Sequence, residues 1–96
     1  FLISPIFARP MRVVKEIPHH RFKITVFSWN NKYIIKIEEA HLEQTFKIDE
    51  KEVNGMDEIE AMLTDDFLLK AMKRFVEMSK DFAEVWRDRY SNLKKN

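Results

Sequence analysis

The pair Asn30-Asn31 constrains the fold of this chain more than any other feature, because a hairpin turn at this pair places every neighbouring residue on a sensible face. One face of the hairpin is then almost entirely apolar, and it pairs Ser28 with Tyr33, Val26 with Ile35, and Ile24 with Ile37. The opposite face pairs Trp29 with Lys32, Phe27 with Ile34, Thr25 with Lys36, and Lys23 with Glu38. A register shift of one residue would scramble both faces, so the pattern predicts a two-residue turn and this pairing.

Two further segments extend the hairpin into a sheet. Residues 11–17 are expected to form a first strand that Pro18 stops, and residues 43–48 a fourth strand after a turn at residues 39–42. The expected pairs on the apolar face are Ile17 with Phe22, Val13 with Val26, Ile35 with Phe46, and Tyr33 with Ile48. The alternation therefore predicts a four-stranded antiparallel meander with one buried face.

Helices are expected in the second half of the chain. Asp57 and Glu60 have the spacing of an N-cap residue and its reciprocal partner, which predicts a short helix that ends near Leu63. Thr64 is expected to cap a second helix, and the acidic side chains that follow it suit the positive end of the helix dipole. The helical repeat then continues nearly to the C-terminus without proline or glycine, and we expect any break near residues 79–81. The predicted fold class is α+β, with the meander followed by a short helix and a long C-terminal helix.

The length of the last helix suggests self-association. A helix over residues 65–94 would run about 45 Å, whereas an eight-residue strand covers only about 27 Å. The helix is therefore longer than the sheet that it should cover. Its distal half carries Phe82, Val85, Trp86, Tyr90 and Leu93. Large aromatic side chains are costly to leave in water, so this half should either bend back onto the domain or be buried in another chain. We favour burial in a homodimer.

The charges are unevenly distributed along a chain whose formal net charge is only +1. Residues 1–37 carry seven basic and one acidic side chain, residues 38–69 carry two basic and eleven acidic, and residues 70–96 carry eight basic and four acidic. The basic sheet beside the acidic connector could bind an anionic partner, or the two parts could neutralise each other within the fold or across a dimer. Of the two, we favour neutralisation.

The first ten residues are apolar and end before Met11. They lack the basic start and the length of a secretory signal, and they are too short to span a bilayer. We interpret residues 1–10 as an N-terminal extension outside the native chain and residues 11–96 as a single α+β domain. The alternative is that the extension is native and docks its apolar side chains on a partner. We expect no membrane association. The chain has no cysteine, which is compatible with a cytoplasmic protein.

The second face of the sheet is a candidate interaction surface. Its members are Phe27, Trp29, Lys32, Ile34 and Lys36. Aromatic rings interleaved with lysines on an open antiparallel sheet can stack on bases and contact phosphates of single-stranded nucleic acid. The acidic residues Glu38, Glu43 and Asp49 share this face and weaken its positive field. The alternative, which we favour, is that the rings form a dock for a helix, such as the distal segment of a partner.

Catalysis is not expected from the motifs in the chain. There is no glycine-rich phosphate loop, no nucleophile motif and no metal-ligand spacing, so no cofactor or metal is predicted. His19 and His20 are adjacent on a turn without an evident third ligand, and we interpret them as a solvated turn. The many carboxylates near residues 49–60 suit solubility and helix starts better than acid/base chemistry, which requires a cleft that separates their pKa values.

Several short segments resemble a family of small bacterial proteins of unassigned function. They are Lys15-Glu-Ile-Pro-His19, Phe22-Lys-Ile, Phe27-Ser-Trp-Asn30, Lys32-Tyr-Ile34, Lys36-Ile-Glu38 and Glu43-Gln-Thr-Phe-Lys47. The resemblance starts at Met11, which agrees with Met11 as the native start, and it implies no activity, cofactor or catalytic residue.

The predicted order of elements is also similar to that of PUR-type and Whirly-type single-stranded nucleic-acid binders, but without a diagnostic motif of either group. A likeness of topology says little about function, which depends on sites.

Together these observations predict a non-enzymatic protein-interaction module that forms a homodimer or binds another protein. Binding of single-stranded RNA or DNA to the Phe27/Trp29 sheet face is the alternative. Catalysis is the third class, and it would need a deep pocket where the histidines meet several carboxylates.

Overall fold

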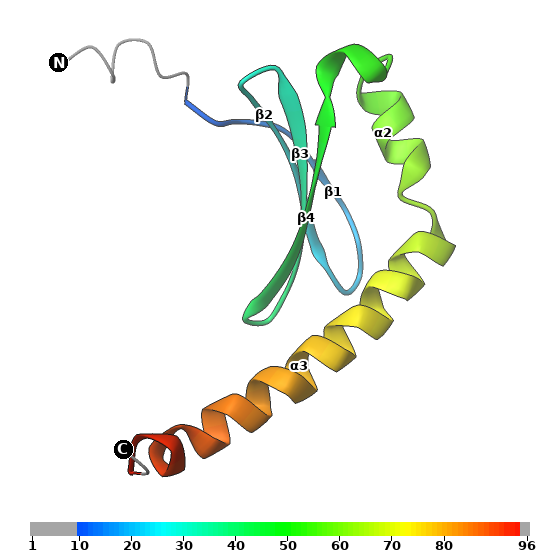
Figure 1. Ribbon diagram of the computed structural model, residues 1–96. Helices are drawn as coiled ribbons and strands as arrows, with labels where there is room; N and C mark the ends of the chain where they lie inside the picture. Colours follow the sequence, from blue (N-terminus) through cyan, green and yellow to red (C-terminus); the bar gives the residue numbers. More distant parts are fainter. Residues whose placement is uncertain (1–9, 95–96) are drawn as a thin grey trace, which may run out of the picture.

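The computed structural model of the chain describes the backbone of residues 10–94 and the side chains as far as Ser91 (Figure 1). The strands are β1 (Arg12–Ile17), β2 (Lys23–Trp29), β3 (Lys32–Glu39) and β4 (Leu42–Asp49). The 3₁₀ turn η1 (Glu50–Glu52) and the helices α2 (Met56–Met62) and α3 (Asp65–Lys94) follow. The four strands lie in the order β1-β2-β3-β4, and all neighbours are antiparallel. The predicted α+β meander with a short and a long helix is confirmed. The prediction about the N-terminal extension falls almost wholly on residues outside the described part.

The central hairpin has the predicted register in all seven cross-strand pairs, from Lys23 opposite Glu38 to Trp29 opposite Lys32. Asn30 and Asn31 both have positive φ angles, 53° and 62°. Two consecutive positive φ angles define a type I′ turn, whose twist matches that of the flanking strands. The predicted pairs between β3 and β4 are also present, with Ile35 opposite Phe46 and Tyr33 opposite Ile48.

The predicted register of the first strand is wrong. Ile17 lies opposite Ile24 rather than Phe22, a shift of two residues that keeps the same face. A bulge between Val13 and Lys15 then places Val13 opposite Phe27, on the second face of the sheet, instead of opposite Val26. Six residues, Pro18 to Lys23, separate the paired Ile17 and Ile24, two more than the four predicted.

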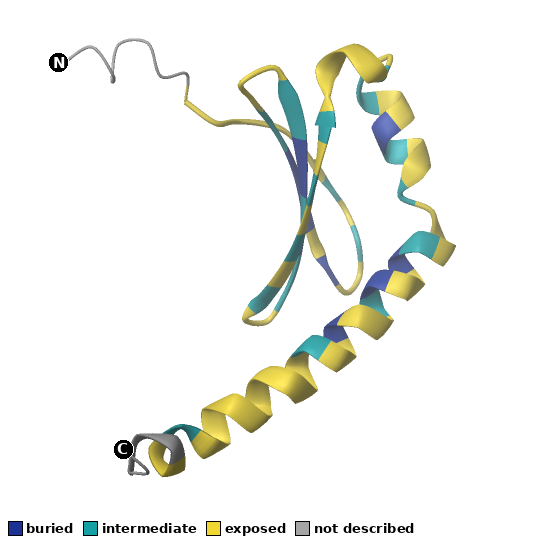
Figure 2. Cartoon of the chain, in the orientation of Figure 1, coloured by how far each residue is buried: buried dark blue, intermediate teal, exposed yellow. Residues whose placement is uncertain are grey.

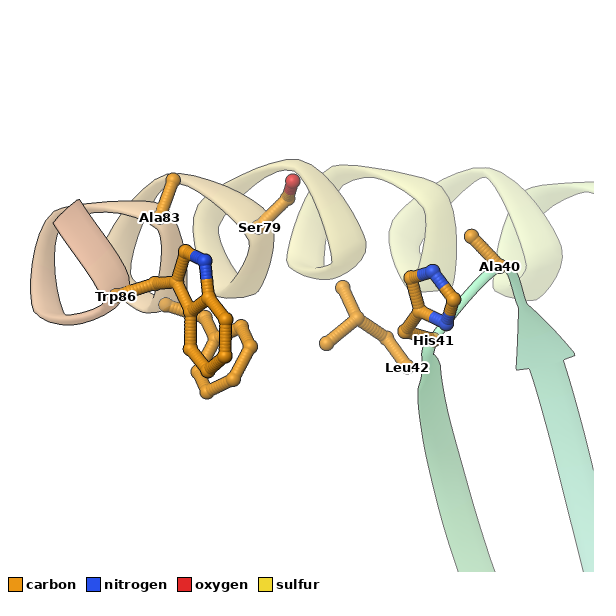
Figure 3. A pocket seen from close by; sticks show the side chains of 7 residues that line it. Ala40, His41, Leu42, Ser79, Ala83 and Trp86 are labelled. Atoms are coloured by element: carbon orange, nitrogen blue, oxygen red, sulfur yellow. The ribbon is translucent and has the colours of Figure 1, made fainter.

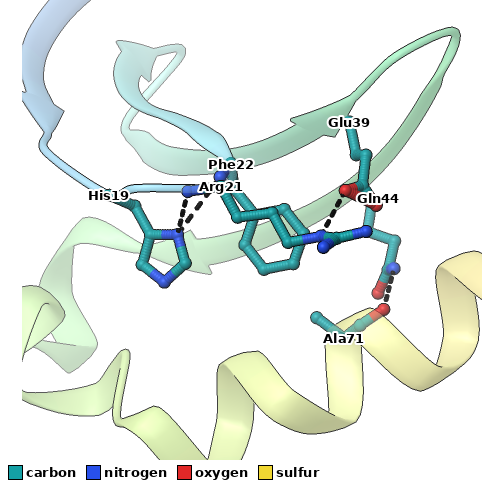
Figure 4. Close-up of polar contacts among 6 residues, drawn as sticks. All are labelled: His19, Arg21, Phe22, Glu39, Gln44 and Ala71. Atoms are coloured by element: carbon teal, nitrogen blue, oxygen red, sulfur yellow. Dashed lines mark hydrogen bonds and ion pairs between the residues drawn. The ribbon is translucent and has the colours of Figure 1, made fainter.

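His19 shapes this longer connection. Its Nδ1 atom accepts hydrogen bonds from the backbone N–H groups of Arg21 and Phe22, each at 3.1 Å (Figure 4). Its ring stacks on His20 and Phe22, with centroid distances of 4.4 and 5.0 Å. The interpretation of this pair as a solvated turn is therefore wrong for His19, which is half-buried and organises the loop.

Both helices lie on the same side of the sheet (Figure 1). The core between the two layers consists of Phe22, Ile24, Val26, Ile35, Ile37, Ile59, Leu68, Ala71 and Phe75. Gln44 of β4 links the layers, because its Nε2 donates to the Ala71 carbonyl oxygen at 2.8 Å (Figure 4) and its Oε1 accepts from Arg74 Nε at 2.8 Å. The first half of α3 is thereby held against the sheet.

The two helix starts differ in how well the sequence predicts them. Thr64 caps α3 as expected, since its Oγ1 accepts a hydrogen bond from the N–H of Phe67 at 3.1 Å. The predicted Asp57/Glu60 capping pair is wrong. The N-cap of α2 is Gly55, whose φ of 128° an L side chain rarely adopts. The carboxylate of Glu58, instead, accepts a hydrogen bond from the N–H of Asn54 at 2.7 Å.

Ion pairs join the basic first part of the chain to its acidic middle part. Lys15 on β1 pairs with Glu60 on α2, Arg21 pairs with Glu39 at 2.6 Å, and Lys32 pairs with Asp49 at 3.2 Å. This arrangement agrees with partial neutralisation of the two parts within one fold.

Ala40, in the turn between β3 and β4, provides a test of backbone strain. Its φ is 53°, a conformation that costs a residue with a Cβ about 1–2 kcal/mol. We expect Ala40→Gly to raise the free energy of unfolding by about 0.5–1 kcal/mol, because the gain exceeds the added entropy of the unfolded chain. Urea denaturation measures it. The matched change in helix α2, Ala61→Gly, should lower stability by about 0.5–1 kcal/mol, and an equal loss for both variants would contradict the argument.

Candidate functional site

The second half of α3 extends beyond the sheet without a break. The helix runs for 30 residues, and the predicted weak point at residues 79–81 stays helical. Phe75 is the last buried residue, and every described side chain from Ser79 to Ser91 is exposed except the half-buried Arg89 (Figure 2). Neither proline nor glycine occurs here, so the backbone has no local reason to bend. Of the two outcomes foreseen for this half, bending back onto the domain is excluded for the described residues.

The exposed half carries an apolar surface that we call the distal stripe. Its members are Phe82, Val85, Trp86 and Tyr90, which are 55%, 63%, 58% and 61% exposed. Leu68, Phe75 and Phe82 are spaced by seven residues, close to two helical turns, so the stripe continues the face that the sheet covers further up the helix. Leu93, the fifth predicted member, has its backbone in α3, but its side chain lies outside the described part.

Aromatic and cationic contacts preorganise the distal stripe. The rings of Phe82 and Trp86 lie 6.2 Å apart, centroid to centroid. The guanidinium of Arg89 lies over the rings of Trp86 and Tyr90, at 4.0 and 4.5 Å from the two centroids. Cation–π contacts of this kind restrict the rings without removing their outer surfaces from water. The stripe is thus a partly ordered row of rings.

An open cavity of about 480 Å³ lies where the distal stripe passes the turn between β3 and β4. We call it the turn pocket, and its walls are Ala40, His41, Leu42, Ser79, Phe82, Ala83 and Trp86 (Figure 3). Most of these side chains are apolar, and the pocket is therefore suited to a hydrophobic group. No sequence pattern predicts the turn pocket, because its two walls are about forty residues apart along the chain.

The second sheet face is not covered by any helix of the described chain (Figure 1). Trp29 is 39% exposed and Val13, brought here by the bulge, is 56% exposed, whereas Ile34 is buried. Phe27 is half-buried, and the Nζ atom of Lys36 lies 5.3 Å from its ring centroid. The structure therefore brings together the predicted residues of this face as a small aromatic patch with Val13 added.

The charges on the second sheet face are balanced. Its four lysines are Lys23, Lys32, Lys36 and Lys47, and its four carboxylates are Glu16, Glu38, Glu43 and Asp49. Lys32 is moreover engaged in an ion pair with Asp49. A face with no net positive charge attracts phosphates weakly, since counterion release depends on the number of phosphates that cations neutralise.

The polar groups of the described chain form no evident metal centre. No cluster of three or more histidine, aspartate or glutamate side chains with suitable spacing occurs among residues 10–91. Within the described part of the chain, no helix combines the length and the apolar character needed to cross a bilayer.

Comparisons with family models, with curated proteins and with solved structures find no match to this chain. The likeness to small bacterial proteins and the topological likeness to PUR-type and Whirly-type binders therefore stay predictions.

Proposed function

We propose that this chain is a non-enzymatic protein-interaction module that self-associates through the distal stripe of α3. The single observation that carries the proposal is the row of four large apolar side chains, each more than half exposed, on a helix that has left its own sheet. Contiguous apolar patches of this kind mark interaction surfaces in soluble proteins. A cytoplasmic location is part of the proposal, and the absence of cysteine is compatible with it.

Light scattering over a dilution series tests the proposal. The expected particle at tens of micromolar has twice the chain mass of 11.6 kDa, and it should dissociate on dilution. A stable mass of one chain at the highest concentration would overturn self-association. The stripe would then have to bind a different protein, which is the second form of the same class of function.

Single-stranded nucleic-acid binding on the second sheet face is the alternative function. The observation in its favour is that Trp29, Phe27 and Lys36 lie together on a face that no described helix covers. The balanced charges speak against it, so we rank it second.

Replacement of Trp29 separates the two functions. If this ring stacks on a base, Trp29→Ala should weaken binding of an oligonucleotide by about 1–3 kcal/mol, and the affinity should fall steeply with salt. Fluorescence anisotropy of a labelled oligonucleotide measures both effects, with Trp86→Ala as a matched control on the distant helix. No binding by the unmodified chain at low salt would exclude this function.

A further inference from the structure

We propose that two copies of this chain pair through antiparallel distal halves of α3, with Tyr90 of each copy seated in the turn pocket of the other. This inference rests on the proposed self-association and adds its geometry. The two-fold axis passes near Trp86, close to the middle of the overhang. Residue 90 of one copy then lies opposite residue 82 of the other, beside the turn pocket.

The position of the sheet selects the antiparallel arrangement. The sheet packs on Leu68, Ala71 and Phe75, on the same face of α3 that carries the distal stripe. A parallel second helix lying along this face would therefore run into the sheet. An antiparallel helix contacts only the distal half and then continues past the C-terminal end of α3, where Figure 1 shows no other element.

The apolar surface of the distal stripe alone is too small for a stable interface, so the interface must include the turn pocket as well. Three aromatic rings that are 55% to 61% exposed contribute roughly 260–435 Å² per copy, if a packed ring buries about 150–250 Å². A stable interface needs about 800 Å² per partner. The walls of the turn pocket lie directly beside the stripe and can supply much of the difference.

Helix geometry directs Tyr90 to this pocket. At about 100° per residue, Ser79, Ala83 and Tyr90 lie on the same side of the distal stripe. When two identical helices pack antiparallel about a two-fold axis, each side of the contact face on one helix lies next to the same side on the other helix. Tyr90 of the second copy therefore faces Ser79 and Ala83, which form the helical wall of the turn pocket.

Charge complementarity supports the same register. Asp81 and Arg89 are spaced by eight residues, nearly symmetrically about the proposed axis, and Arg89 lies within the stripe, over the rings of Trp86 and Tyr90. In the antiparallel pair, Arg89 of each copy lies near Asp81 of the other. Neither side chain has an ion-pair partner within 4 Å among the described residues.

Engineered disulfides test the orientation, because the chain contains no cysteine. The double variant Ala83→Cys/Tyr90→Cys should become a covalent dimer under mild oxidation, seen on a non-reducing gel. The two positions are about 10 Å apart along one helix, too far to bridge within one chain. The variant Ser79→Cys should stay uncross-linked, because the two copies of residue 79 are about 21 Å apart in the antiparallel pair. Val76→Cys reports random collisions, because residue 76 precedes the stripe and lies beyond the overlap of the two distal halves.

The outcomes separate this inference from the proposed function. A dimer by light scattering in which Ser79→Cys cross-links and the double variant does not would overturn the antiparallel arrangement and leave self-association standing. A dimer in which neither variant exceeds Val76→Cys would move the interface away from the distal stripe and overturn the inference. A monomer would overturn both.

A charge exchange tests the register without cysteines. Asp81→Arg and Arg89→Asp should each weaken the dimer by about threefold to fivefold, as expected for an exposed ion pair. The doubly exchanged variant should bind more tightly than either single variant, but less tightly than the unmodified chain, because it lacks the cation–π contacts of Arg89 with Trp86 and Tyr90. A double variant that binds no more tightly than either single variant, with both single variants folded by circular dichroism, would contradict the pairing of Arg89 with Asp81.

Discussion

Phe75→Ala is expected to lower the free energy of unfolding by about 3–5 kcal/mol, the usual cost of removing a large ring from a packed core. Phe75 is 2% exposed and lies against Phe22, with ring centroids 5.6 Å apart. Its loss leaves a cavity in the core between α3 and the sheet. Urea denaturation followed by circular dichroism measures the change.

The same substitution seven residues later is the matched control. Phe82 belongs to the same face of the same helix, but it is 55% exposed. Phe82→Ala should change the stability of the monomer by less than about 0.5 kcal/mol. Both variants must be measured in dilute solution, because self-association would add to the apparent stability. A similar loss for both would mean that the distal half of α3 is packed against its own domain.

Val85→Glu is expected to raise the dissociation constant of the dimer at least about thirtyfold, which corresponds to about 2 kcal/mol. Burial of the new carboxylate against the apolar stripe of a second copy would leave a charge without a partner, and Asp81 nearby would repel it. The monomer should keep its stability, because Val85 is 63% exposed. Sedimentation over a concentration series measures the dissociation constant.

Val76→Glu is the control for this change. Val76 lies on the same helix and is 49% exposed, but it precedes Phe82, the first residue of the distal stripe, by about 9 Å along the helix axis. The control variant introduces the same charge and should dimerise like the unmodified chain. Equal weakening by both substitutions would point to a general charge effect and would contradict an interface on the stripe.

The hairpin shows why some features could be predicted from the sequence. The register of β2 against β3 follows from a two-residue turn and from side chains that alternate between two faces, and both signals lie within about sixteen neighbouring residues. The cap at Thr64 is equally local. The length of α3 could be predicted because its apolar repeat has no proline or glycine to end it.

The first strand shows why other features could not be predicted. Its register depends on the imidazole of His19, which accepts two backbone hydrogen bonds within a loop two residues longer than predicted. Apolar alternation carries no sign of this interaction. The start of α2 was misplaced for a related reason, because a glycine backbone provides the N-cap at a position where side-chain spacing favoured Asp57.

The sequence alone determined that this chain builds a four-stranded meander and a helix too long for it, because period-two and period-3.6 patterns are local properties of the chain. Only the tertiary structure decided where the surplus helix goes. The contacts of Leu68, Ala71 and Phe75 with the sheet set the direction of α3, so the distal stripe passes the turn at Ala40 and creates the turn pocket with it. Such a meeting of distant segments depends on packing in three dimensions, which no local pattern encodes.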